Sequence, residues 1–281
     1  MKTFQLAQTT VPALGMGTWY LGEGDQATSQ QEIAALRYGL DHGLTVIDTA
    51  EMYGEGKSET LVGQAIAGYP REQLFLISKF YPWHAGARQM RHALENSLAR
   101  LGVDYLDLYL YHWRGTTPLE ETMAGMQALQ EAGLIRHYGV SNFDVGDLQE
   151  AATCTGGENI AANEVCYNLA ARGIDFDLRP YQKEHHQSLI GYSPFNSGSG
   201  DTIRLPQSVQ ALARAKHISS HQLMLAWTMR DQDVLPIPKA SSAAHMQQNI
   251  AALDVTFTPD ELAVIDAAFP APTKKQPLTM I

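Results

Sequence analysis

The sequence predicts an α/β protein of the (β/α)8, or TIM-barrel, class. Eight short apolar runs each end in a polar or aromatic residue, and a helical pattern follows each run. After the first run the spacing is roughly 30 residues, the length of a strand-plus-helix unit, except for one longer gap before the last run. The runs end at Thr18-Trp19, Asp48, Lys79, His112, Ser141-Asn142, Glu164, Tyr192 and Lys239.

The predicted strands are short and apolar, as strands that are covered on both faces should be. Residues 74–77 and 106–110 are the clearest examples. The eight runs begin near Leu14, Thr45, Leu74, Tyr105, His137, Ile160, Ser188 and Val234.

Three sequence patterns mark helix starts. Ser29-Gln30-Gln31-Glu32 is a capping box that predicts a helix from Ser29. Thr117 and Thr258 are each followed by a proline, a residue that favours the first position of a helix. Apolar residues recur at helical spacing after these starts, and the Leu and Met stripe within residues 119–126 is interpreted as core filling.

Two segments depart from the repeat. Residues 3–14 alternate weakly around Thr9-Thr10, which indicates a β-hairpin ahead of the barrel. Residues 195–204 are rich in Gly, Ser and Asn and indicate a long loop, which is usually functional when it lies on the carboxyl rim. We find no linker or low-complexity region, so we predict a single domain over residues 1–281.

Composition limits the possible functions. The net charge of −10 argues against a nucleic-acid or anionic-membrane surface, because those partners need clustered Lys and Arg. Cys154 and Cys166 form no C-x-x-C pair and are interpreted as reduced thiols. His185-His186 lacks Cys or carboxylate partners at metal-binding spacing, so we expect no metal. Neither a signal peptide nor a membrane-spanning run is found, and we expect a cytoplasmic protein.

Residues 22–27 suggest an alternative, a Rossmann dehydrogenase, because they match the dinucleotide fingerprint G-x-G-x-x-A. In that motif the glycine-rich turn follows its strand at once and opens the helix directly. Here residues 19–21 intervene, and the predicted helix cap comes later, at Ser29. This alternative would make the two glycines essential to cofactor affinity and leave Lys239 irrelevant.

Four ionisable residues, Asp48, Tyr53, Lys79 and His112, lie at or just beyond three successive strand ends. Because every strand of such a barrel carries its carboxyl end to one rim, these side chains should meet there. Singly, each has an ordinary structural interpretation, such as packing, a turn or solvation. Jointly, in this order on consecutive strand ends, they indicate a catalytic site.

This set of groups suits the reduction of a carbonyl. A phenol has a pKa of about 10, and a lysine cation about 4 Å away lowers that pKa by at most roughly 3 units. Asp48 would keep Lys79 charged, and a neutral His112 would donate a hydrogen bond to the substrate oxygen. Together they form a donor site for an oxygen that gains negative charge and then a proton, provided that a hydride source lies opposite.

Five motifs resemble, in order, those of the aldo-keto reductase family, and the resemblance extends from Leu14 to Phe269. The motifs are residues 43–50 with Tyr53-Gly54, Ser78-Lys79, residues 104–113, residues 135–143 and Ile237-Pro238-Lys239. More narrowly, the chain resembles bacterial members that reduce methylglyoxal and similar small aldehydes. The resemblance implies a (β/α)8 barrel with an N-terminal β-hairpin closing its floor, and NADPH lying extended over the rim.

The resemblance also implies roles for individual residues. Tyr53 would be the acid, Lys79 and Asp48 would tune it, and His112 would orient the carbonyl. The implied cofactor-binding residues are Ser141, Asn142, Glu164, Tyr192, Ser193, Phe195, Lys239, Ser241, His245, Gln248 and Asn249. Ser141, Asn142 and Glu164 would meet the nicotinamide carboxamide, and Tyr192 would stack on the nicotinamide ring. Ser193 and Phe195 would approach the pyrophosphate. Lys239, Ser241 and His245 would meet the 2′-phosphate, with Gln248 and Asn249 near the adenine.

Two positions depart from the family pattern. Glu164 stands where glutamine is usual, and a carboxylate can accept from the carboxamide amino group but cannot donate to its oxygen. Its charge would also perturb Tyr53 if the two lie close together. His245 stands where an arginine is common, so we expect NADPH to be preferred over NADH by a smaller margin, one that widens at lower pH where histidine side chains take up a proton.

The substrate pocket is expected to have aromatic walls. Trp19, Trp83 and Trp113 fall just beyond strand ends. Only a short tail follows Phe269, which suggests an open site for small aldehydes or α-dicarbonyls. We expect a monomer that binds a small carbonyl compound. The rival interpretation is a cofactor-binding barrel with a redox-sensing or scaffold role and little turnover, against which the intact set of four ionisable residues argues.

Overall fold

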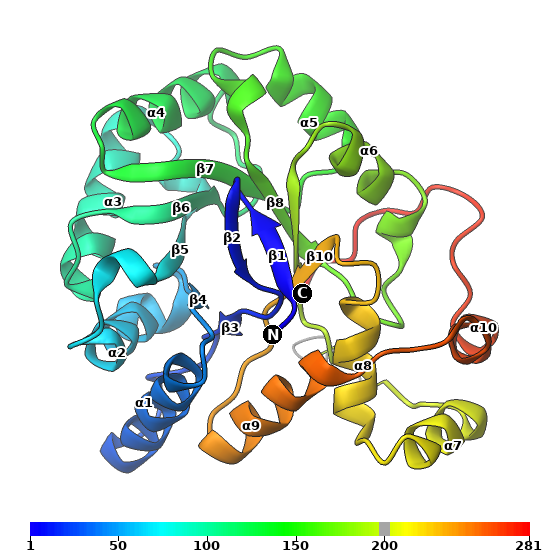
Figure 1. Cartoon of the computed structure of the whole chain (residues 1–281). Coiled ribbons are helices and arrows are strands. Elements are labelled where there is room, and N and C mark those ends of the chain that lie inside the picture. Colours follow the sequence, from blue (N-terminus) through cyan, green and yellow to red (C-terminus); the bar gives the residue numbers. More distant parts are fainter. Residues whose placement is uncertain (197–202) are drawn as a thin grey trace.

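The computed structural model describes residues 1–196 and 203–281, and eight parallel strands in it curl into a barrel with helices around the outside (Figure 1). The strands lie side by side in chain order, which confirms the predicted (β/α)8 class. They are β3 (Met16–Gly17), β4 (Val46–Asp48), β5 (Phe75–Phe80), β6 (Leu106–Tyr111), β7 (Ile135–Ser141), β8 (Ala162–Cys166), β9 (Ser188–Tyr192) and β10 (Val234–Pro236).

The barrel closes between its first and last strands. Gly17 forms a parallel bridge with Lys239, and the Gly17 amide donates to the carbonyl of Pro238 at 3.1 Å. A Cβ atom at position 17 would lie only 2.4 Å from the carbonyl oxygen of Ile237. The closure therefore needs glycine at this position.

Helices connect successive strands, and the long gap before β10 contains two of them. Of this pair α8 packs on β10, whereas α7 packs on α10, the last helix of the chain. The α-helices are α1 (Gln26–Asp41), α2 (Lys57–Ile66), α3 (Ala87–Leu101), α4 (Leu119–Glu131), α5 (Val145–Ala152), α6 (Leu178–Glu184), α7 (Gln207–Ala215), α8 (Ser220–Thr228), α9 (Ala243–Ala251) and α10 (Pro259–Ala268). Short 3-10 turns are η1 (Tyr53–Gly56), η2 (Arg71–Gln73), η3 (Pro82–His84), η4 (Gly157–Asn159), η5 (Gly173–Asp175) and η6 (Ala252–Asp254).

The predicted helix starts were right in one case out of three. Thr258 caps α10 in a capping box with Pro259 following, as the sequence indicates. The prediction for α1 was wrong, because Asp25 is the cap and accepts a hydrogen bond from the Thr28 amide at 2.8 Å. Helix α4 begins two residues after Thr117 and has no side-chain cap. Aspartate and serine are about equally good caps, so local sequence does not choose between them.

A hairpin of β1 (Thr3–Leu6) and β2 (Thr9–Pro12) closes the floor of the barrel, as predicted. Its turn is at Ala7-Gln8 and not at Thr9-Thr10; both turn residues have positive φ, 45° and 66°. The Ala7 amide donates to the hydroxyl of Ser188, the first residue of β9, at 3.0 Å. In Figure 1 the hairpin crosses the middle of the barrel opening.

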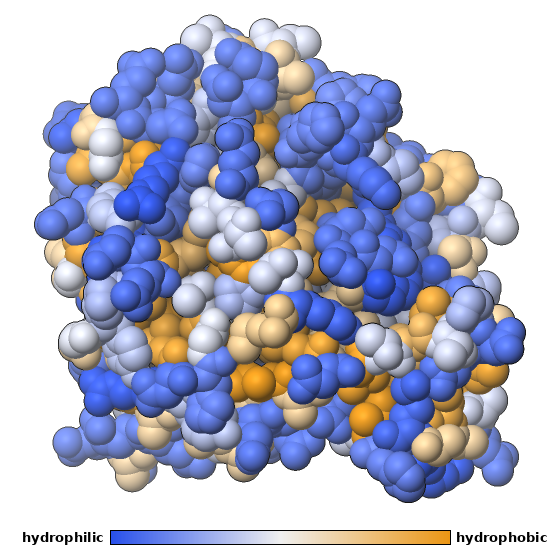
Figure 2. All heavy atoms as spheres, viewed as in Figure 1, coloured by the Kyte–Doolittle hydropathy of each residue, from blue (hydrophilic) through white to orange (hydrophobic). Residues whose placement is uncertain are grey.

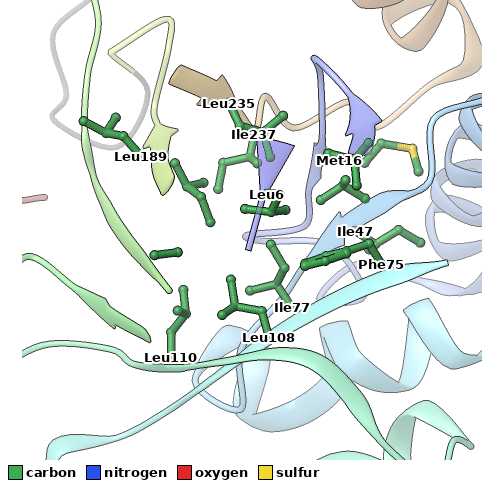
Figure 3. Close-up of a cluster of buried hydrophobic side chains, with 14 of the residues drawn as sticks. Leu6, Met16, Ile47, Phe75, Ile77, Leu108, Leu110, Leu189, Leu235 and Ile237 are labelled. Atoms are coloured by element: carbon green, nitrogen blue, oxygen red, sulfur yellow. The ribbon is translucent and has the colours of Figure 1, made fainter. Parts of the chain in front are cut away.

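The barrel interior is a packed apolar core. Figure 3 shows Leu6 of the hairpin surrounded by side chains from several strands, among them Ile77, Leu108, Leu235 and Ile237. These side chains are buried, and Leu6 is 0% exposed. The hairpin therefore closes the amino ends of the strands, and within the barrel the space for a ligand lies at the carboxyl ends.

The face seen in Figure 2 is mainly hydrophilic, with hydrophobic residues in separate patches. In the part of the chain that the structure describes, no helix has the length and hydropathy needed to cross a membrane. No group of three or more His, Cys, Asp or Glu side chains among those residues could hold a metal ion. Cys154 and Cys166 are free thiols.

Candidate active site

A buried ion pair lies at the carboxyl rim of the barrel, between the neighbouring strands β4 and β5. The Lys79 amine donates to both carboxylate oxygens of Asp48, at 2.6 and 2.7 Å, and to the carbonyl of Thr49 at 3.1 Å. Burial alone would lower the pKa of Lys79, but the negative charge of Asp48 and Glu164 outweighs burial and raises it. Lys79 is therefore a fixed positive charge inside the site.

Tyr53 extends over this ion pair from the turn after β4. Its hydroxyl lies 3.2 Å from the Lys79 amine. Three residues with positive φ follow it, Gly54 (57°), Glu55 (54°) and Gly56 (87°), and they turn the chain sharply into α2. This left-handed turn is the local reason that Tyr53 lies over the strand end, since two of the three positions are glycine.

The prediction that Lys79 brings the pKa of Tyr53 below its usual value is wrong in direction. Burial raises the pKa of the Tyr53 hydroxyl above its ordinary range, although the Lys79 cation opposes this shift. The reason is that burial removes the water that would solvate a phenolate, and the charges of Asp48 and Glu164 also oppose it. Tyr53 is thus held as a neutral phenol with a cation beside its oxygen.

Glu164 reaches the same lysine from β8. One of its carboxyl oxygens lies 3.4 Å from the Lys79 amine, and its side chain is 3% exposed. Its other oxygen, Oε2, has no hydrogen-bond partner among the described residues. The sequence expectation that this carboxyl would influence Tyr53 is therefore correct in geometry, because both groups contact one ammonium.

His112 lies directly after β6, and its ring is edge-on to that of Tyr53 with 5.9 Å between centroids. Burial, together with the Lys79 cation, lowers the pKa of His112 well below its usual range. The imidazole is therefore neutral, as expected. Its Nδ1 atom has no partner within the described parts of the chain.

Asp48, Tyr53, His112 and Glu164 line one end of a cavity of about 420 Å³ at the carboxyl rim, whereas Lys79 is buried behind this lining. The other end lies along Ile237, Pro238 and Lys239, next to the closure of the barrel. The remaining described residues of its lining are Gly17, Thr18, Trp19, Tyr20, Met52, Trp113, Ser141, Asn142, Tyr192, Ser193, Pro194, Phe195, Met280 and Ile281.

Ser141, Asn142 and Tyr192 form a hydrogen-bonded chain on one wall of the cavity. The Tyr192 hydroxyl donates to the Asn142 side-chain oxygen at 2.9 Å, and the Asn142 amide nitrogen donates to the Ser141 hydroxyl at 3.1 Å and to the His112 carbonyl at 3.2 Å. The Ser141 hydroxyl donates in turn to the carbonyl of Glu164 at 2.9 Å. The side chains on this wall are therefore held in place before any ligand binds.

Several residues of the lining adopt backbone conformations that side chains normally avoid. Tyr20, Asn142 and Ser193 have φ angles of 66°, 60° and 50°. Such conformations are often found at functional sites, where the surrounding structure holds them. The sequence contains no sign of this at Tyr20 or Ser193, since neither residue type favours positive φ.

The predicted cofactor-binding residues beyond the barrel lie around the start of α9. Lys239 lines the cavity, with its amine 5.8 Å from the centre of the Tyr20 ring. Ser242 rather than Ser241 caps α9, accepting a hydrogen bond from the His245 amide at 3.3 Å. His245 and Gln248 are exposed, and Asn249 is buried. Ser241 is half-buried and, like these three, lies outside the cavity lining.

The aromatic residues of the rim divide into two groups. Trp19 and Trp113 line the cavity, as expected. Trp83 does not line it; the side chain is 63% exposed, stacked on Tyr81 with 4.1 Å between ring centroids and edge-on to Trp113 at 6.2 Å. Residue 83 is the middle residue of η3 and points away from the cavity.

Sequence reasoning missed the contribution of the tail. Met280 and Ile281 line the cavity, so the segment after α10 returns to the rim and narrows the mouth. An ion pair between Lys275 and Asp144, 3.0 Å apart, ties the tail to the start of α5. The tail contains no secondary structure and no periodic pattern, so no local signal places it there. The predicted loop at 195–204 lies in part, at 197–202, outside the described residues.

Comparison with known proteins gives a consistent result. The aldo/keto reductase family profile matches residues 13–269. Methylglyoxal reductase YeaE of Escherichia coli is 46% identical over 97% of this chain and 96% of its own length, and an aldo-keto reductase of Mycolicibacterium vanbaalenii is 34% identical over 92% and 88%. A crystal structure of an aldo-keto reductase from Klebsiella pneumoniae in complex with NADPH is 48% identical, with a TM-score of 0.96 over 100% of this chain and 99% of the other.

Proposed function

The chain belongs to the aldo/keto reductase family, and we propose that it reduces small aldehydes and α-dicarbonyls of the methylglyoxal type to alcohols, with NADPH as the reductant. The observation that carries this proposal is the Tyr53 hydroxyl, 3.2 Å from a buried ammonium at the wall of a cavity. Such a phenol can give a proton to an oxygen that becomes negative as its carbon receives hydride.

Tyr53 is the proposed acid. Its raised pKa keeps the phenol protonated until the carbonyl oxygen gains charge, and the Lys79 cation then stabilises the phenolate that remains. Asp48 holds Lys79 in place and charged through two hydrogen bonds. His112, neutral and adjacent to the Tyr53 ring, would donate a hydrogen bond to the same carbonyl oxygen and align it.

The residues of the cavity fit a nicotinamide cofactor. His112 and Glu164 line the same end of the cavity, and each has a buried polar atom without a partner among the described residues, so each keeps hydrogen-bonding capacity that a carboxamide or a carbonyl could use. Asn142 and Ser141 would hold the carboxamide, and the Tyr192 ring would cover the nicotinamide. Bound there, NADPH supplies the hydride that the reduction requires.

The rest of the cofactor would follow the cavity toward α9. Ser193 and Phe195 would lie near the pyrophosphate, and Lys239 would meet the 2′-phosphate at the far end of the lining. Ser241 and His245 would contribute to the phosphate site, and Gln248 and Asn249 to the adenine site, at the start of α9. NADH would bind more weakly, because it has no phosphate for Lys239.

The lining of the mouth supports a small substrate. Trp19, Trp113, Met280 and Ile281 form apolar walls around the reacting end. The similarity to a methylglyoxal reductase supports α-dicarbonyls as one class of substrate. We propose a monomer as the active unit, and analytical ultracentrifugation would test that point.

A panel of carbonyl compounds tests the proposal. Loss of NADPH absorbance is followed with methylglyoxal, aromatic aldehydes and sugars, and with NADH in place of NADPH. We expect turnover with methylglyoxal and small aldehydes, a lower catalytic efficiency with sugars, and a preference for NADPH. Binding of NADPH without turnover of any compound in the panel would favour the sensing or scaffold interpretation.

A further inference from the structure

Two carboxyl groups and one ammonium are buried together at the rim, and their charges do not balance. Asp48 and Glu164 both contact Lys79, and the three side chains are 0–3% exposed. If both carboxyls were ionised, the cluster would hold one uncompensated negative charge out of contact with water. A buried charge without a partner is expensive, and a group in this position normally takes up a proton.

The hydrogen bonds indicate which carboxyl holds the proton. Lys79 directs its strong contacts to Asp48, at 2.6 and 2.7 Å, and its remaining bonds go to the Thr49 carbonyl and the Tyr53 hydroxyl. From Lys79, Glu164 receives only the weaker contact at 3.4 Å; its side chain also interacts directly with the Asp48 carboxyl, and its Oε2 atom has no hydrogen-bond partner among the described residues. Asp48 is therefore the carboxylate that pairs with Lys79, and Glu164 is the carboxyl whose ionised form has no cation left to balance it.

The groups around Glu164 support this assignment from each side. They are Asp48 on β4, Tyr53 on η1, Lys79 on β5 and Tyr192 on β9, while His112, directly after β6, faces the same lysine. Lys79 is the one cation in this group, since burial keeps His112 neutral. Burial, with the Asp48 charge as the next cause, raises the pKa of Glu164 well above its usual range.

We propose that Glu164 carries a proton in the active form of the enzyme, and that loss of this proton switches off Tyr53 as an acid. The proposal rests on the reductase function proposed above. With Glu164 neutral, the charges of Lys79 and Asp48 balance, and a phenolate at Tyr53 is the only further negative charge in the cluster. With Glu164 ionised, a second negative charge contacts Lys79 and opposes the phenolate.

The proton also resolves the mismatch with a carboxamide ligand. A carboxylate has acceptors only, whereas a protonated carboxyl has one O–H donor and one carbonyl acceptor, which is the pattern of a glutamine side chain. Glu164 can therefore donate to the oxygen of a carboxamide and accept from its nitrogen. At neutral pH the protonated Glu164 offers the same donor and acceptor as a glutamine side chain. Unlike glutamine, it loses its donor when the carboxyl ionises at higher pH.

Infrared spectroscopy of the protein without ligands tests the protonation directly. We expect a carbonyl stretching band of a buried protonated carboxyl at neutral pH, a band that Glu164→Gln removes. Glu32→Gln is the matched control: Glu32 is a buried carboxyl on α1 that accepts from the Gly22 amide at 2.9 Å, away from the catalytic groups, and its replacement should leave the band in place. No band in the wild type, or an unchanged band in Glu164→Gln, would overturn the proposal.

Kinetics test the switch. In a single turnover with NADPH and methylglyoxal, the wild-type rate should fall about tenfold per pH unit once Glu164 ionises, whereas Glu164→Gln should lack this decline. Equal pH profiles would overturn the switch. Absence of turnover at every pH would refute the reductase function, and the infrared band would still decide the protonation. If Glu164→Gln does not fold, the band in the wild type and its loss at alkaline pH decide.

Discussion

The two ends of the barrel are built by the same eight strands and differ completely in character. At the amino ends, the hairpin and the strands meet in apolar contacts centred on Leu6. At the carboxyl ends, two residues further along the same strands, the inward positions hold ionisable groups, as in the step from Ile77 to Lys79 or from Leu110 to His112. Stability and chemistry are thus separated along each strand, over a few residues.

Positive φ angles occur at both ends, for different reasons. At the floor, Ala7 and Gln8 form a two-residue turn that joins β1 to β2. At the rim, positive φ angles occur at three isolated residues on the wall of the cavity: Tyr20, Asn142 and Ser193. The positive φ angles at the floor form a compact turn, whereas those at the rim belong to residues that line the cavity.

The largest effect on both turnover and stability is expected at Lys79, a charged side chain that is buried at the rim. Lys79→Met removes the cation beside Tyr53 and leaves Asp48 and Glu164 without a partner. We expect catalytic turnover to fall by about 10³-fold or more, and the free energy of unfolding to fall by about 3–5 kcal/mol. Steady-state NADPH oxidation and urea unfolding measure the two losses.

The loss of stability in Lys79→Met has a defined dependence on pH. In the wild type, burial already raises the pKa of Asp48 although the Lys79 cation opposes this shift, so removal of the cation raises the pKa of Asp48 in the folded state further above its value in the unfolded chain. A group of this kind favours the folded state at low pH, and that contribution is lost as the pH rises through the folded pKa. The variant should therefore be closest to the wild type in acid, and a loss that grows toward acid would contradict the account.

At the floor of the barrel, a substitution should lower stability and leave catalytic activity unchanged. Leu6→Ala removes a side chain that is fully buried in the barrel, so we expect the free energy of unfolding to fall by about 2–5 kcal/mol. Catalytic efficiency with methylglyoxal should stay unchanged, because Leu6 does not line the cavity. Gln5→Ala, at an exposed position of the same strand, is the control and should alter stability by less than about 0.5 kcal/mol. A large loss of activity in Leu6→Ala would show that the two ends are coupled.

The smallest effect is expected at the edge of the rim, on α9. His245→Arg places a permanent charge near the proposed 2′-phosphate site, so the preference for NADPH over NADH should increase by about tenfold. Gln247→Arg adds the same charge at another exposed position of the helix and should change the preference less. Catalytic efficiencies with the two cofactors measure this, and equal shifts in both variants would mean that residue 245 does not contact the phosphate.

The sequence predicted the features that depend on short stretches of chain. The eight strands and the rim positions of Asp48, Lys79 and His112 follow from apolar runs that end in polar residues. The cap of α1 was misplaced, because Asp25 and Ser29 are both good caps in adjacent turns. Local patterns therefore locate elements well and their first residues less well.

The features that were missed depend on distances across the barrel. The contact of Glu164 with Lys79 joins β8 to β5, two strands that are not neighbours, and it follows from the curvature of the sheet. The direction of the Tyr53 pKa depends on how completely the hydroxyl is buried, which sequence does not show. The return of Met280 to the cavity depends on the path of a tail without secondary structure.

Replacement of one hydroxyl group tests the central claim, that Tyr53 protonates the carbonyl oxygen during reduction. In Tyr53→Phe, NADPH-dependent reduction of methylglyoxal should fall by about 10²–10⁴-fold, while NADPH binding, followed by protein fluorescence, and the melting temperature stay close to wild type. Tyr69→Phe, which removes a hydroxyl bonded to Asp41 away from the cavity, should retain full activity. Turnover in Tyr53→Phe within a few-fold of the wild-type rate would contradict the account.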